Sequence, residues 1–110
     1  MYHTLVINGE EYKLRLNTRD IVALEKKLGC NPMGIFTGVG GAKIPTVTDM
    51  TMVFHASLQQ YHHGKKLEDA QDLYDAWINE EGHSMTDFVN EIMELYRVSG
   101  IIPTEANEKN

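Results

Sequence analysis

The segment that decides the fold is Leu5-Val6-Ile7-Asn8-Gly9-Glu10-Glu11-Tyr12-Lys13-Leu14-Arg15-Leu16. At its centre, Asn8 and Gly9 are the residue pair that best tolerates the two positive φ angles of a type I′ turn. A hairpin closed by this turn places Ile7 opposite Glu10. The segment therefore predicts a two-stranded antiparallel β-hairpin over residues 4–16.

The predicted register divides the hairpin into an apolar and a polar face. Since side chains alternate along both strands and Leu5 faces Tyr12, five large apolar side chains share one face: Leu5, Ile7, Tyr12, Leu14 and Leu16. The other face receives Val6, Glu11, Lys13 and Arg15. An isolated two-stranded hairpin is at best marginally stable in water, so helices or another chain must cover the apolar face.

Length and composition indicate one globular domain. The chain has 110 residues, 42% hydrophobic and 24% charged, which is ordinary for a soluble protein with a single core. No apolar run approaches the roughly 20 residues that span a bilayer. The N-terminal residues 1–4 lack the basic and apolar regions of a signal peptide. We therefore expect one domain over residues 1–103, located in the cytoplasm and without a membrane partner.

The net charge of −6 argues against nucleic-acid binding. Neutralising phosphates requires clustered Lys and Arg, whereas this chain has two short basic pairs, Lys26-Lys27 and Lys65-Lys66. Both pairs fall at a helix end or in a loop, where a solvated cation near a helix terminus is favourable. We expect no nucleic-acid partner.

Four helices are expected after the hairpin, at about residues 19–28, 47–63, 67–81 and 85–98. In each, apolar residues recur at helical spacing, and a glycine follows the last of them: Gly29, Gly64, Gly82 and Gly100. Asn17 and Ser84 are good N-capping residues before the first and last helix. The predicted fold class is α+β, mainly α, with an N-terminal β-hairpin packed on a bundle of about four helices.

Three other segments have their own expectations. Asn31-Pro32 predicts a short helical turn through Phe36, because Asn caps a helix and Pro suits its first position. Residues 37–43 contain three glycines without the spacing or ending of a phosphate loop, which favours a mobile connector. Residues 104–110 are polar and are expected to form a disordered tail.

No catalytic or metal-binding pattern occurs in the sequence. His55, His62 and His63 fall on the second predicted helix, but the chain lacks a His pair at i and i+4 and a His-Glu-x-x-His pattern. The carboxylates of residues 68–81 form a polar helix face. Nothing in the sequence indicates that one of them is buried in the low-dielectric pocket that acid–base catalysis needs. We predict no metal, no cofactor and no enzymatic activity. His62 and His63 are expected to meet the unpaired carbonyls of the last turn before Gly64.

The six methionines suggest a binding role. Methionine side chains adapt to irregular apolar partners, although filling the core is their commoner role. On the second predicted helix, Met50 shares a stripe with Phe54 and Leu58, whereas Met52 falls on the opposite side. Met52 is therefore a candidate for exposure and partner binding.

Residues 7–16 (INGEEYKLRL) and 21–32 (IVALEKKLGCNP), followed by 55–64 (HASLQQYHHG) and 73–75 (LYD), form a longer pattern. This pattern resembles tail assembly chaperones of long-tailed, siphovirus-type phages and prophages of Gram-positive bacteria, and it covers most of residues 7–100. The resemblance implies a helper that is missing from the mature virion. Such a helper binds the tape measure protein during tail assembly, with tail tube protein as a further candidate partner.

A chaperone of this kind would hold amphipathic stretches of a helical client against an apolar groove. Six apolar residues are candidate partner contacts, although any of them could belong to the core instead: Met33, Ile35, Phe36, Met52, Ile101 and Ile102. A structural tail component, such as a connector or completion protein, is the alternative. A small DNA-binding regulator is less favoured, because the last two helices carry Asp and Glu on their polar faces.

Overall fold

The hairpin forms with the predicted register. In the computed structural model, which describes residues 1–38, 41–42, 44–80 and 82–103, β1 (His3–Ile7) pairs antiparallel with β2 (Glu10–Leu14). Ile7 lies opposite Glu10, as expected. Asn8 and Gly9 have φ angles of 51° and 79°, which a type I′ turn requires.

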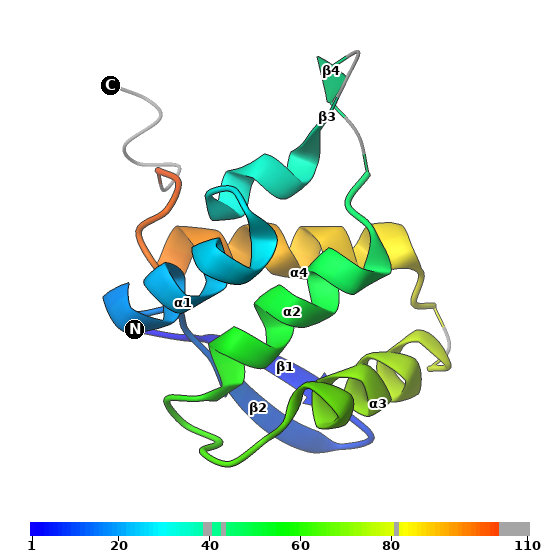
Figure 1. Ribbon diagram of the computed structural model, residues 1–110. Helices are drawn as coiled ribbons and strands as arrows, with labels where there is room; N and C mark the ends of the chain where they lie inside the picture. Colours follow the sequence, from blue (N-terminus) through cyan, green and yellow to red (C-terminus); the bar gives the residue numbers. More distant parts are fainter. Residues whose placement is uncertain (39–40, 43, 81, 104–110) are drawn as a thin grey trace.

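Helices cover the apolar face of the hairpin. β2 contacts α2 (Val47–Leu58), and β1 contacts α3 (Leu67–Ile78) and α4 (Met85–Val98). In Figure 1, the hairpin lies beneath α2 and α4, with α3 at its side. The five predicted core residues are at most 7% exposed: Leu5, Ile7, Tyr12, Leu14 and Leu16. The predicted fold class, a hairpin packed on four helices, is confirmed.

The first and last helices begin and end close to the predicted residues. α1 spans Thr18–Leu28, and Asn17 and Asp20 form a reciprocal capping box at its start. Gly29 ends α1 with a φ angle of 74°, which glycine adopts without steric cost. The Ser84 hydroxyl accepts a hydrogen bond from the Asp87 N–H at the start of α4. Local capping signals therefore define both of these helices.

The second helix is shorter than predicted, because α2 ends at Leu58 instead of residue 63. The carbonyl of Ser57 accepts a hydrogen bond from the Arg15 N–H of the chain leaving β2, at 3.1 Å. That carbonyl is the acceptor that an α-helical N–H of residue 61 would use. The Gln59 N–H bonds the carbonyl of Ala56, three residues back, which tightens the turn. A tertiary contact thus ends α2 before the glycine signal at Gly64.

The third helix also ends early, because α3 stops at Ile78 instead of residue 81. The carbonyl of Trp77 accepts bonds from the Glu80 N–H, three residues on, and from Nδ1 of His83. The His83 ring also stacks on the Trp77 indole at 3.9 Å. Closure of the chain onto Trp77 therefore replaces the last predicted helical turn.

Between α1 and α2, the predicted helical turn appears as the 3₁₀ helix η1 (Pro32–Phe36). The predicted connector partly forms a small antiparallel ladder, β3 (Thr37–Gly38) with β4 (Gly41–Ala42), which the sequence did not indicate. In Figure 1 this ladder projects on the side opposite the hairpin. The rest of the connector, residues 39–40 and 43, and the predicted tail at 104–110 lie outside the described residues.

An aromatic cluster joins three helices in the core. Phe88 of α4 contacts the rings of Phe54, Tyr74 and Trp77 at centroid distances of 5.5, 4.8 and 5.2 Å. These contacts are edge-to-face, the arrangement that aromatic quadrupoles favour. Within the part of the chain that is described, no helix is long and apolar enough to cross a membrane.

Candidate functional site

The six predicted partner contacts do not form one open apolar surface. Ile35 is 1% exposed and belongs to the core, so its assignment as a surface residue is wrong. η1 turns it inward, which the short helical signal at Asn31-Pro32 did not determine. The other five are half-buried and pack against the core from η1, α2 and the segment after α4: Met33, Phe36, Met52, Ile101 and Ile102.

Met52 lines a groove between α1 and α2. The groove has a volume of about 90 Å³. The lining residues follow the i, i+3, i+4, i+7 spacing of a single helix face on each side: Asp20, Ala23, Leu24 and Lys27 from α1, and Met52, His55 and Ala56 from α2 with Gln59 at its C-cap. The groove therefore follows directly from the packing of two helix faces.

Small side chains line the groove on both helices. Ala23 and Ala56 leave space between the helices, and buried Leu24 contributes apolar surface from α1. The half-buried Met52 adds a flexible, polarisable side chain that can fit apolar groups of different shapes. A groove with these walls suits an aliphatic side chain better than a polar ligand.

Polar groups around the groove are held by hydrogen bonds. Nε2 of His55 donates to the carbonyl of Lys65 at 3.0 Å, and Nε2 of Gln59 donates to the same carbonyl at 3.0 Å. Burial lowers the pKa of His55, and the charge of Lys27 acts in the same direction, against the bond to Lys65 and the charge of Asp69. The α2–α3 loop is therefore fixed against the end of the groove.

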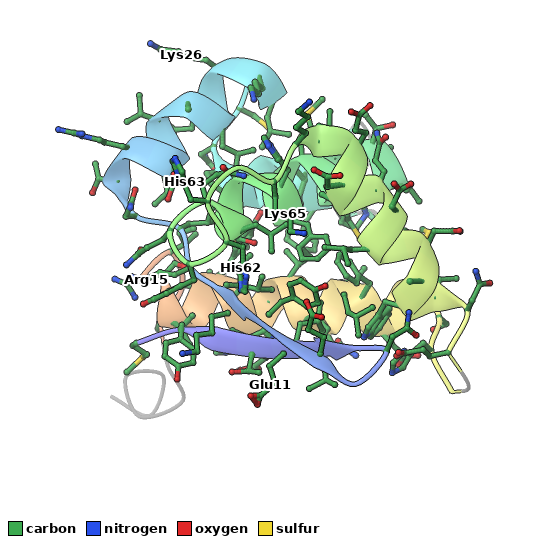
Figure 2. All side chains as sticks on the ribbon, turned by 90° about the horizontal axis from the view of Figure 1, so that it is seen from below. Glu11, Arg15, Lys26, His62, His63 and Lys65 are labelled. Atoms are coloured by element: carbon green, nitrogen blue, oxygen red, sulfur yellow. The ribbon has the colours of Figure 1, made fainter. Side chains whose placement is uncertain are left out.

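His62 has a different role from the one expected. Its Nε2 accepts a hydrogen bond of 2.8 Å from the Lys13 N–H on the outer edge of β2, and its ring lies 5.2 Å from that of Tyr12. Figure 2 shows His62 between the loop and the hairpin. The predicted contact of His62 with helix-terminal carbonyls is wrong, because α2 has already ended at Leu58. His63 is exposed.

An exposed aromatic cluster beside His62 was missed by the sequence analysis. The rings of Tyr2 and Tyr61 contact edge-to-face at 5.4 Å. The Lys13 ammonium lies 5.0 Å from the Tyr2 centroid and 6.0 Å from that of Tyr61. The outward alternation of Lys13 was the available signal, but Tyr61 lies after the end of α2 at Leu58, which the sequence did not predict.

The histidines and acids do not gather into a metal site in the described portion of the chain, where no group of three or more His, Cys, Asp or Glu could hold a metal ion. His3 pairs with Glu91 at 2.8 Å, and His83 pairs with Glu80 at 3.3 Å. These pairs join the hairpin to α4 and close the turn after α3.

The structure is a small α+β domain with a groove between two helices. The chain belongs to DUF6096, a family of unknown function, whose family model matches residues 2–109. No curated protein and no solved structure matches the chain.

Proposed function

We propose that this protein is a tail assembly chaperone of a siphovirus-type phage or prophage. It binds the tape measure protein in the host cytoplasm while the tail assembles, and tail tube protein is a further candidate partner. The resemblance of residues 7–16 and 21–32 to such chaperones supports the class of protein. The observation that carries the binding mode is the apolar groove containing Met52.

The binding mechanism is capture of a helix by a groove. A client helix lying along α1 and α2 inserts one apolar side chain between Ala23 and Ala56, against Met52. Fully burying such a side chain contributes about 1.5–3 kcal/mol, so one contact gives a weak and reversible interaction. A long client with many apolar side chains then binds several copies of the chaperone.

The acidic exterior supports this role. Exposed carboxylates follow one face of α3, at Glu68, Asp72 and Asp75, and the chain carries a net charge of −6. Mutual repulsion between copies keeps a chaperone soluble when many copies coat one client. Apolar binding surface and acidic outer surface thus lie on different elements.

Co-expression of the chaperone with tape measure fragments tests the proposal. Met52→Asp puts an unpaired charge into the groove and should abolish co-purification of the client. Val22→Asp is the matched control, because Val22 lies on α1 outside the groove and is 45% exposed. Equal recovery of the client by both folded variants would contradict binding in the groove. Stoichiometric amounts of the protein in purified virions would instead identify a structural tail component.

A further inference from the structure

The charges around the groove are not equally available to a partner. Asp20 lines the groove, but its Oδ2 accepts a bond from the Asn17 N–H at 3.2 Å in the capping box of α1. Asp69 is close enough to His55 to affect its pKa, and its Oδ2 accepts a bond from the Lys66 N–H at 2.8 Å. Both carboxylates are therefore held by helix N-termini.

The cation at the other end of the groove has no such restraint. Lys27 lines the groove in the last turn of α1. The charge of Lys65 acts on His62 instead, although the carbonyl of Lys65 accepts the bonds from His55 and Gln59 at this end of the groove. Among the described residues, the Lys27 ammonium forms no ion pair with a carboxylate. The groove thus presents one cation, Lys27, at this end, on a protein with a net negative charge.

We infer that the groove selects a helical segment carrying a carboxylate about one turn away from the apolar side chain that enters it. This inference rests on the proposed function only in taking the groove as the docking site. On α1, Lys27 is one helical turn beyond Ala23 and Leu24. Residues one turn apart on a helix have Cβ atoms about 5–6 Å apart. A carboxylate one turn along a client helix aligned with α1 then falls opposite Lys27.

The net charge of the chaperone does not cancel this selection. At physiological ionic strength, exposed charges more than about 8 Å apart are largely screened. A partner carboxylate in contact with Lys27 is inside that range, whereas the acidic outer face of α3 belongs to a different element. One exposed ion pair contributes little affinity, but exchanging Glu for Lys on the partner replaces an attraction to Lys27 by a repulsion. We therefore expect the dissociation constants of the two partners to differ by about five- to tenfold.

Two synthetic amphipathic helices with the same apolar face are the probes. One carries Glu and the other carries Lys one turn to either side of a central leucine, and their dissociation constants are measured by fluorescence anisotropy at low and high salt. The wild-type protein should bind the Glu peptide about five- to tenfold more tightly at low salt, with the difference shrinking at high salt. Lys27→Glu should reverse the preference.

Lys26→Glu is the matched control. It makes the same charge change in the same last turn of α1, but Lys26 does not line the groove, and Figure 2 shows it pointing away from the rest of the molecule. Lys26→Glu should keep the preference for the Glu peptide within about twofold. An equal loss of preference in both variants would show that net charge, and not Lys27, selects the partner, and would overturn the inference.

The Met52→Asp variant separates failure of the inference from failure of the proposed function. If both peptides bind the wild type equally and Met52→Asp weakens both, the groove is the docking site but charge selection is wrong. If neither peptide binds, or if Met52→Asp has no effect on either, docking in the groove is wrong and the inference is overturned with it.

Discussion

The hydroxyl of Tyr96 donates a hydrogen bond of 2.8 Å to the carbonyl of Pro32. Both residues are buried, and the bond joins the last turns of α4 to the start of η1 across most of the sequence. Burial raises the pKa of Tyr96, so the hydroxyl keeps its proton and remains a donor. Phe36 completes the contact, with its ring edge-to-face to Tyr96 at 6.0 Å.

We predict that Tyr96→Phe lowers the free energy of unfolding by about 1–3 kcal/mol, because the buried Pro32 carbonyl loses its donor. Urea denaturation followed by circular dichroism measures the change. Tyr61→Phe, at an exposed tyrosine, is the control and should change stability by less than about 0.5 kcal/mol. Equal midpoints for Tyr96→Phe and the parent would show that the hydrogen bond does not stabilise the fold.

The register of the hairpin gives a second prediction. Leu14→Asp should prevent folding, because Leu14 is 2% exposed and an unpaired carboxylate in its place adds a desolvation cost of several kcal/mol to the lost burial. Val6→Asp, on the outer face at 49% exposure and opposite Glu11, should lower the thermal midpoint only slightly, through repulsion between the two carboxylates. A folded Leu14→Asp variant with the parent's midpoint would contradict the assigned faces.

Stability should depend on pH through His62. Burial and the charge of Lys65 lower the pKa of His62 below its ordinary value of 6.5, and protonated Nε2 can no longer accept the Lys13 N–H. The unfolded chain therefore binds more protons just below pH 6.5, so stability falls as the pH decreases from there. The pKa of His55 is also lowered, so protonation of His55 likewise reduces stability as the pH decreases.

Thermal midpoints of His62→Gln between pH 7.5 and about pH 5 test this linkage. The glutamine carbonyl can still accept the Lys13 N–H but does not titrate, so the fall in stability should be smaller than in the parent. His63→Gln, at the exposed neighbour, should follow the parent's profile. Identical profiles for parent and His62→Gln would remove His62 from the pH dependence.

Features with local causes could be predicted from the sequence. The Asn8-Gly9 turn, the capping box at Asn17 and the glycine after α1 act within a few residues, and the structure confirms the elements that they define. The end of α2 could not be predicted, since it depends on the bond from Arg15 to Ser57, two residues far apart in the sequence. Ile35 was misplaced for the same reason, because tertiary packing of η1 decides its burial.

The groove was only partly predictable. Met52 was singled out because it falls opposite the apolar stripe of its helix, and it does line the groove. The other wall comes from α1, and no pattern within α1 says which helix it will contact. Ala23 and Ala56 carried a signal, since one small side chain on each helix leaves room for a groove, but the sequence alone does not say that these two helices pack together.

The central claim is that a client helix docks against Met52, and methyl NMR tests it most directly. The ε-methyl groups of the six methionines would be labelled with ¹³C and their resonances followed as purified tape measure protein is added. We predict that the Met52 methyl resonance shifts or broadens strongly, while that of Met85, which is 37% exposed at the start of α4, does not. A change at Met85 with an unaltered Met52 resonance, or no change at any methionine, would contradict docking in the groove.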